Sequence, residues 1–438
     1  MVKMSKIKPA DSTWYRLDNS AKIYPAIISD RETTLFRISF TLKEQIDPTA
    51  LQQALENVYD RFPYYNVVLG KGLFWNYLEK NEEPHSIHCD TPHPCENINA
   101  VYYNGYLYKV LYFKNKISTE FSHVMTDGFG GLEYTKTLVM EYLRIMGYEI
   151  KNDGSIIEPD SKIDPMEISD DHKRYAKDLN YPEPDVNEKN LFGDIKAFQT
   201  KGRYLPLGTF NVITGIINIS DLKKISKYYG VTITEFLVTV YMETLIEIQK
   251  KQIKKTGNYK SVAIQVPVNM RNMLESCSMR NFSLFVTPTV DPPDFPDFSG
   301  LLSFIKKFMR NNTGIDKMMQ LLRYNVSLGE SNLVKHVPLF LKLPITKYII
   351  STKGSAQHSG TFSNLGLIKL PPDMLKHVEQ ITCNLAPDPN SKATCGATGY
   401  NGKIYLSFGR TIKDAIIERD FFRRLRKLGI PIRIKSNC

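Results

Sequence analysis

The chain of 438 residues has no run of about 18 apolar residues, so its sequence offers no helix that could cross a bilayer. The first six residues, Met1–Lys6, lack the apolar core of a secretory signal, and we therefore expect a cytoplasmic protein. Cysteine is sparse, with six residues and no Cys-x-x-Cys pair. That usage is typical of free thiols in a reducing compartment rather than of a disulfide framework.

Signatures of several function classes are also missing. The chain contains no phosphate-binding loop, no serine-hydrolase Gly-x-Ser-x-Gly elbow and no RNA-recognition signature. Gly128-Phe129-Gly130 begins a dinucleotide-binding pattern, but Glu133 stands where its third glycine should be. These gaps argue against nucleotide hydrolysis, serine hydrolysis, a Rossmann site and nucleic-acid binding.

One loop collects five residues of the kinds that bind zinc, namely His85, His88, Cys89, His93 and Cys95. Three prolines interrupt the same stretch, and no paired cysteines accompany it. We interpret the group as chance crowding and predict no metal site.

The net charge of +11 fits a polyanionic partner such as a coenzyme A phosphate or the acidic surface of a carrier protein. The distribution of the basic residues does not indicate which partner binds, because the basic run Lys250–Lys255 is typical of the solvated end of a helix. The apolar residues of segment 421–428 recur at helical spacing, which predicts a terminal helix docked on the core rather than a membrane foot.

The clearest positive signal is Ser-His-Val-Met-Thr-Asp-Gly at Ser122–Gly128. Two alternating runs at 106–113 and 117–121 predict strands before it, and apolar residues at helical spacing predict a helix after it, ending near Gly147. A histidine at the end of a strand is held by a rigid scaffold, and the ordinary pKa of its side chain is close to neutral. We therefore predict that His123 is a general base.

Periodicity predicts helices and strands in both halves of the chain. In the first half it predicts strands near 34–40, 67–77 and 101–121 and a helix over 48–61 with Asp47 as N-cap. In the second half it predicts helices from 220 and 232, over 299–310 and over 314–323, and strands at 211–219, 262–267, 282–286, 361–362, 381–385 and 404–408. The charged, proline-containing stretch 151–189 reads as a crossover that buries little.

We divide the chain into an N-terminal lobe at 1–150, a charged linker at 151–200 and a C-terminal lobe at 201–438. Helices mixed with antiparallel-looking strands in both halves predict an α/β fold with α+β layering.

The motif and its neighbours resemble the chloramphenicol acetyltransferase-like superfamily, which includes the condensation domains of peptide synthetases. Further matches follow in the same order along nearly the whole chain, at 47–63, 266–271, 281–283 and 361–366. With Trp14–Asp18 added, the chain is most similar to bacterial alcohol acetyltransferases. One departure is Ser122, which stands where many relatives carry the first of two adjacent histidines.

The resemblance implies two similar lobes, each a mixed sheet flanked by helices, with the active site at their interface. It implies an acyltransferase in which an acceptor alcohol attacks an acyl thioester, with acyl-coenzyme A expected as donor, while His123 takes the proton. The donor is a substrate, so no permanently bound cofactor is expected. Two alternatives stay open: an amide-forming condensation enzyme, and a non-catalytic module that binds a carrier protein or another partner.

The resemblance also assigns supporting roles. It implies that Asp127 pairs with an arginine and holds the loop, with Arg271 and Arg16 as candidates, although Asp127 could instead orient His123. Gly128 is expected to permit the turn and leave space for substrate. Candidates for oxyanion or substrate contacts are Asn281, Ser363, Asn364 or a backbone amide.

Overall fold

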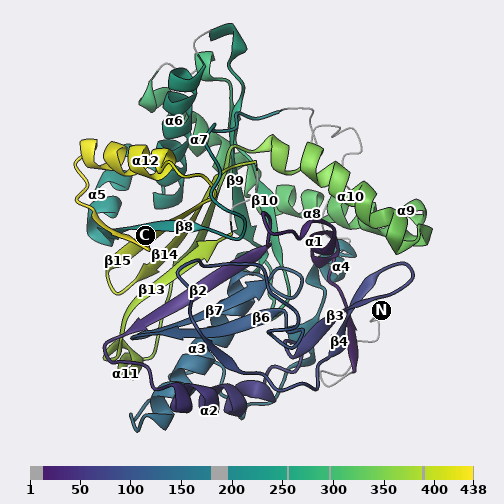
Figure 1. Ribbon diagram of the computed structural model, residues 1–438. Helices are drawn as coiled ribbons and strands as arrows, with labels where there is room; N and C mark the ends of the chain where they lie inside the picture. Colours follow the sequence, from purple (N-terminus) through teal and green to yellow (C-terminus); the bar gives the residue numbers. More distant parts are fainter. Residues whose placement is uncertain (1–12, 179–195, 254–255, 295–296, 387–389, 438) are drawn as a thin grey trace.

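The computed structural model describes residues 13–178, 196–253, 256–294, 297–386 and 390–437. Within them the chain forms two lobes, each with its own sheet and its own cluster of buried apolar residues (Figure 1). This is the two-lobed α/β arrangement that the sequence predicted. The first six residues, residues 179–195 of the predicted linker, part of the basic run at 250–255 and Cys438 lie outside the described residues.

The N-terminal lobe is built on a five-stranded sheet in the order β13-β2-β7-β6-β5. Its strands are β2 (Leu35–Leu42), β5 (Ile87–Cys89), β6 (Tyr108–Phe113), β7 (Lys116–Ser122) and β13 (Val378–Leu385). The helices α2 (Pro48–Tyr59) and α3 (Gly128–Ile145) pack together against this sheet. A small three-stranded sheet joins β1 (Trp14–Arg16), β4 (Asn76–Lys80) and β3 (Val67–Lys71).

The C-terminal lobe contains an eight-stranded sheet in the order β10-β9-β12-β14-β15-β8-β16, with β11 also paired to β9. Its strands are β8 (Asn211–Asn218), β9 (Val262–Asn269), β10 (Ser283–Val286), β11 (Thr289–Val290), β12 (Gly360–Leu367), β14 (Ala393–Tyr400), β15 (Lys403–Arg410) and β16 (Arg433–Ser436). Strand β12 runs parallel to both β9 and β14, and the other pairs are antiparallel, so the sheet is mixed.

The helices that belong to this lobe are α5 (Ile219–Tyr229), α6 (Ile233–Gln252), α7 (Phe298–Asn312), α8 (Ile315–Glu330) and α12 (Ile416–Lys427). Helix α6 is the central one, contacting α5, α7, α12 and β9. The predicted terminal helix is α12, and its Phe421, Phe422 and Leu425 are buried in the lobe's core. Shorter helices are α1 (Tyr24–Ile27), α4 (Asp171–Ala176), α9 (Asn332–His336) and α11 (Pro372–Leu375), and α10 spans Leu339–Lys353.

Strand β13 connects the lobes. It lies in the second half of the sequence, yet it pairs along its length with β2 of the N-terminal sheet. Its other side receives hydrogen bonds from the C-terminal sheet, for example from Thr398 Oγ1 to the Ile381 carbonyl at 2.8 Å. Gly396 permits this approach, because an added Cβ would stand 2.3 Å from the Cys383 carbonyl oxygen. Residues of the predicted C-terminal lobe therefore complete the N-terminal sheet.

Most residues in the described part of stretch 151–189 are half-buried or exposed, as its composition predicted, but Glu167 is buried in an ion pair. Arg61 pairs with Glu167 at 2.7 Å, and Glu167 is only 5% exposed. The backbone carbonyl of Glu167 accepts from the Met279 amide of the C-terminal lobe at 2.7 Å. Glu158 and Lys173 of this stretch also form ion pairs, with Arg144 and Glu330, which composition alone does not reveal.

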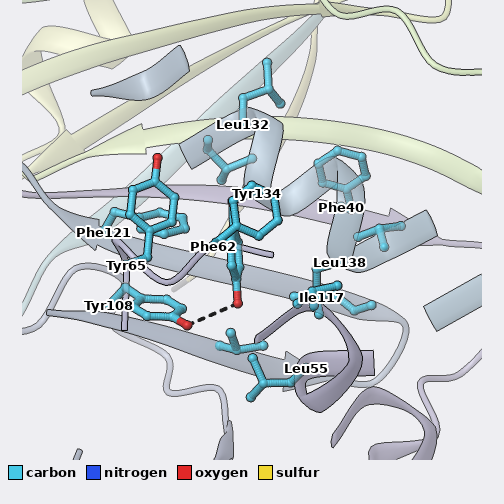
Figure 2. Packing of buried hydrophobic residues seen from close by; sticks show 14 of the residues in the cluster. Phe40, Leu55, Phe62, Tyr65, Tyr108, Ile117, Phe121, Leu132, Tyr134 and Leu138 are labelled. Atoms are coloured by element: carbon cyan, nitrogen blue, oxygen red, sulfur yellow. Dashed lines mark hydrogen bonds between the residues drawn. The ribbon is translucent and has the colours of Figure 1, made fainter. Parts of the chain in front are cut away.

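Aromatic rings fill the core beneath the motif strand and its helix (Figure 2). Phe62 packs on Tyr65 and Tyr134, while Tyr108 stacks on Phe121 with centroids 5.3 Å apart. The Tyr134 hydroxyl donates to the Tyr108 hydroxyl at 3.2 Å, which satisfies a polar atom inside the cluster. This dense packing fixes the strand and helix that flank Ser122–Gly128.

Among the described residues, no helix has both the length and the apolar character needed to cross a membrane.

Candidate active site

The motif loop connects the end of β7 at Ser122 to the start of α3 at Gly128. The amide of His123 continues the sheet pairing by donating to the Thr34 carbonyl at 3.1 Å. Asp127 is the N-cap of α3, and its Oδ1 accepts from the amides of Phe129 and Gly130. The loop is therefore held at one end by a strand and at the other by a helix cap.

The second carboxylate oxygen of Asp127 is bound by the other lobe. Its Oδ2 accepts from Arg271 Nη1 at 2.8 Å, from the Phe282 amide at 2.8 Å and from Ser283 Oγ at 3.1 Å. Burial alone would raise the pKa of Asp127, but the Arg271 charge and these hydrogen bonds outweigh it and hold the pKa below its ordinary value. Asp127 is thus an ionised, fully bonded carboxylate at the lobe interface.

Arg271 is equally well bonded. Its guanidinium also donates to the carbonyls of Ser278 and Arg280 and to Asn269 Oδ1, and it lies 4.5 Å from the ring centroid of Phe129. All the donors of the fork are engaged in a buried setting, the geometry in which arginine pairs are strongest. Arg16, the other predicted candidate, is exposed on β1 and pairs there with β4.

The ring of His123 faces Asn281 from the C-terminal lobe. Nδ1 of His123 lies 3.4 Å from Oδ1 of Asn281, and the Asn281 amide nitrogen donates to the His123 carbonyl at 2.9 Å. The same amide nitrogen donates to Oδ2 of Asp18 at 2.9 Å, and Asp18 is 2% exposed. Asn281 therefore connects the histidine to a buried carboxylate.

These contacts fix the amide orientation and with it the histidine tautomer. Both N–H bonds of the Asn281 amide have oxygen acceptors, so a flipped amide would set oxygen against oxygen at Asp18 and at the His123 carbonyl. Oδ1 of Asn281 is then an acceptor, and Nδ1 of His123 is the donor. The lone pair of the neutral ring lies on Nε2.

Two aromatic rings enclose the imidazole. Tyr24 of α1 stacks on His123 with centroids 5.2 Å apart, and Phe36 of β2 lies 4.8 Å away. Burial lowers the pKa of His123, although the charge of Asp127 and the contacts with Asn281 and Thr126 oppose the shift. His123 is half-buried, so it combines a neutral ring at physiological pH with partial access to solvent.

The loop between His123 and Asp127 is anchored to the C-terminal lobe. Thr126 Oγ1 donates to the Met279 carbonyl at 2.7 Å, and the Tyr65 hydroxyl donates to the same carbonyl at 2.9 Å. A Cβ at Gly130 would stand 2.5 Å from that carbonyl oxygen, so only glycine fits here without a backbone shift. Gly128 is less constrained, because its nearest obstacle is the flexible end of Leu365 at 2.7 Å.

The three predicted oxyanion or substrate contacts have different surroundings. Asn281 donates both of its amide N–H bonds inside the protein, to Oδ2 of Asp18 and to the His123 carbonyl. Asn364 donates to Thr234 Oγ1 at 3.1 Å. Ser363 lies on β12, two residues before Leu365, which faces Gly128 across the lobes.

The five residues considered as zinc ligands are not gathered into a site. Among the described residues no three His, Cys, Asp or Glu side chains lie together as a metal would require. His85 instead stacks on Tyr106 with centroids 4.2 Å apart, and burial lowers its pKa to about 3.

No protein-family model matches the chain, and no curated protein matches its sequence. Solved structures match along nearly its whole length. Polyketide synthase associated protein 5 from Mycobacterium tuberculosis superimposes with a TM-score of 0.60 over 96% of this chain and 97% of that one, at 13% identity. The chain has the two-lobed condensation-domain fold.

Two further structures share this condensation-domain fold. The TRI3 trichothecene 15-O-acetyltransferase from Fusarium sporotrichioides matches with a TM-score of 0.60 over 96% of both chains, at 12% identity. A starter condensation domain of rhizomide synthetase, solved in complex with C8-CoA and Leu-SNAC, matches with a TM-score of 0.58 over 94% of this chain and 93% of that one, at 13% identity. At such identities the likeness establishes the fold alone.

Sequence reasoning named Asn281 as a site candidate but missed its partner Asp18, and it also missed Tyr24, which stacks on His123. Asp18 and Asn281 both stood in segments that carried the resemblance, yet their mutual contact spans 263 residues and has no local signal. Tyr24 belongs to a four-residue helix without a recognisable pattern. Of these residues only Asn281 comes from the C-terminal lobe, so its contact with His123 depends on how the two lobes meet.

Proposed function

We propose that the chain is an acyltransferase that transfers an acyl group from a thioester to an acceptor hydroxyl, with His123 as general base. The observation that carries the proposal is the state of the imidazole. Its Nδ1 faces an acceptor on Asn281, which leaves the lone pair on Nε2, and burial keeps the ring neutral near pH 7.

In the proposed reaction the acceptor hydroxyl gives its proton to Nε2 of His123 as its oxygen attacks the thioester carbonyl. The resulting tetrahedral oxyanion collapses to the ester and expels the thiolate, which takes the proton back from the imidazolium. No residue becomes acylated. The Asn281 and Asp18 side chains act as positioning groups that hold the ring and its tautomer.

Ser363 is the side chain we propose as a hydrogen-bond donor to the oxyanion. Asn281 uses both amide N–H bonds within the protein and Asn364 donates one to Thr234 Oγ1, whereas Ser363 Oγ has no protein partner among the described residues. A single such donor is typically worth about a hundredfold or more in turnover.

Acyl-coenzyme A is the proposed donor and a small alcohol the proposed acceptor, as in an alcohol acetyltransferase. The solved complex of a similarly folded condensation domain with C8-CoA supports a coenzyme A thioester. The net charge of +11 also favours a donor that carries phosphate groups. Amide formation and non-catalytic binding of a carrier protein are the competing functions.

The decisive experiment measures thiol release from acetyl- to longer acyl-coenzyme A with a panel of alcohols and amines. His123→Ala is compared with His377→Ala, which removes a histidine that packs on Tyr148 outside the motif. We expect acceptor-dependent release that only His123→Ala abolishes. Release with amines alone would establish amide formation. Release from no coenzyme A donor, but from carrier-bound thioesters, would replace the donor class, and release from neither would favour a binding module.

A further inference from the structure

Helix α10 (Leu339–Lys353) carries apolar side chains on most of its surface, with the sequence Leu-Phe-Leu-Lys-Leu-Pro-Ile-Thr-Lys-Tyr-Ile-Ile over its first three turns. A helix that is apolar all round is normally buried in a core. Among its side chains that the structure describes, only Leu339 and Lys342 are buried. Figure 1 shows α9 and the adjoining end of α10 at the right-hand edge of the molecule.

The exposed side chains form one apolar surface. Phe340 is 71% exposed, Tyr348 70% and Ile345 55%, and Leu341 and Ile349 are also exposed. The tip of the β3–β4 hairpin adjoins them, because the Leu339 amide donates to the Leu73 carbonyl at 2.8 Å, and Leu73 is 69% exposed. We call these six residues the α10 surface. Contiguous exposure of this kind marks an interaction site.

The helix is fixed in this position by Lys342, which is buried. Lys342 Nζ donates to the Phe74 carbonyl at 2.8 Å and lies 3.3 Å from the ring centroid of Trp75. On its other side α10 packs on α1, whose Tyr24 stacks on His123. The exposed apolar side chains therefore belong to a helix that is fixed in place, and α1 lies between this helix and His123.

Charge identifies the kind of partner. Residues 331–372 contain no aspartate or glutamate and five lysines, of which Lys335 pairs with Glu330 at 2.8 Å and Lys342 is buried. Within α10, Lys347 is exposed between Ile345 and Tyr348. Apolar and aromatic side chains with interspersed lysines and no acids are the composition of surfaces that bind the headgroup region of anionic bilayers. A second copy fits poorly, since its α10 surface would offer Lys347 no acidic partner.

We propose that the α10 surface docks on an anionic lipid bilayer. The helix lies in the plane of the interface with Phe340, Ile345 and Tyr348 inserted and Lys347 directed to the headgroups. A helix of 15 residues is too short to cross the hydrocarbon core, so the contact is peripheral. The docking stands independently of the reaction that His123 performs.

The test is co-sedimentation of the full chain with vesicles of phosphatidylcholine and phosphatidylglycerol in equal parts, and with phosphatidylcholine alone. The variant Phe340→Ser/Ile345→Ser/Tyr348→Ser removes the inserted side chains. The matched control Val101→Ser/Leu207→Ser/Tyr228→Ser removes three apolar side chains that are 90%, 61% and 83% exposed on other elements. Circular dichroism and thermal melting check that both variants are folded.

We expect binding to the anionic vesicles that weakens with added salt, and a loss of about tenfold or more in partition coefficient for the α10 variant alone. Lys347→Glu should weaken binding to anionic vesicles without affecting the fold. Absence of binding by the unmodified chain, or an equal loss in the control variant, would overturn the proposal. So would a dimer, seen by analytical ultracentrifugation without vesicle binding, that the α10 variant dissociates.

Discussion

Asp127 and His123 stand four residues apart on one loop, yet the protein surrounds them differently. Asp127 receives hydrogen bonds on both carboxylate oxygens, and its pKa is held below the ordinary value. Nδ1 of His123 has only a long contact of 3.4 Å with Asn281, and the pKa of His123 is also lowered, in this case by burial. The carboxylate is fully hydrogen-bonded, which fits a structural group, whereas the proposed reaction uses the Nε2 atom of the imidazole.

The largest expected effect on stability comes from removing the fully hydrogen-bonded Asp127 carboxylate. Asp127→Ala leaves the Arg271 guanidinium buried without its counter-charge, which typically costs about 3–5 kcal/mol. We expect a correspondingly lower free energy of unfolding, measured with urea, and loss of activity with it. An unfolding free energy within about 1 kcal/mol of the parent would show that Asp127 does not hold the lobes together.

The variant His123→Ala tests the proposed role of the imidazole as general base. We expect kcat to fall about 100- to 10,000-fold, the usual worth of a general base, with a much smaller loss of stability than in Asp127→Ala. Steady-state kinetics and urea unfolding of the same preparations separate the two effects. Equal losses of stability in both variants would contradict the proposal that Asp127 is structural and His123 is catalytic.

Asn281→Ala sharpens the assignment of the tautomer. Removal of the acceptor at Nδ1 should lower kcat roughly 3- to 10-fold, the range of one hydrogen bond. Because the Asn281 contact raises the pKa of His123, its loss should also move the acid limb of the pH profile to lower pH. Asn364→Ala, which removes an amide bonded to Thr234, is the control and should leave that limb in place.

The pH dependence of the parent enzyme follows from the same histidine. Burial lowers the pKa of His123 below 6.5, so the ring is neutral and active above that pH and takes a proton only as the pH falls further. We expect kcat/KM to be flat above pH 7 and to decline below a pKa under 6.5. A limb centred above pH 7 would mean that the proton acceptor is another group.

The smallest expected effect belongs to Arg16→Ala. Arg16 is exposed on β1, away from the Asp127 carboxylate, so its removal should change the unfolding free energy by about 0.5 kcal/mol or less. Arg271→Ala, measured beside it, should reproduce the loss seen in Asp127→Ala. A larger effect from Arg16 than from Arg271 would reverse the assignment of the ion pair.

The sequence by itself determined the local features of this protein. Alternating and helical periodicity predicted β2, α2, β7, α3 and α6 close to their observed bounds, because those patterns depend on neighbours in the chain. The Ser122–Gly128 motif, a local sequence pattern, likewise predicted the loop between β7 and α3. The pattern predicted no element between 324 and 360, where the structure places α9 and α10.

Only the tertiary structure decided the long-range features. Contacts such as Asn281 with His123, 158 residues apart, exist because the lobes close on each other, and no local pattern encodes them. The place of β13 in the N-terminal sheet depends on the same closure. Helix α10 shows the limit most clearly, since its apolar sequence would serve equally in a core, and only the fold leaves it at the surface.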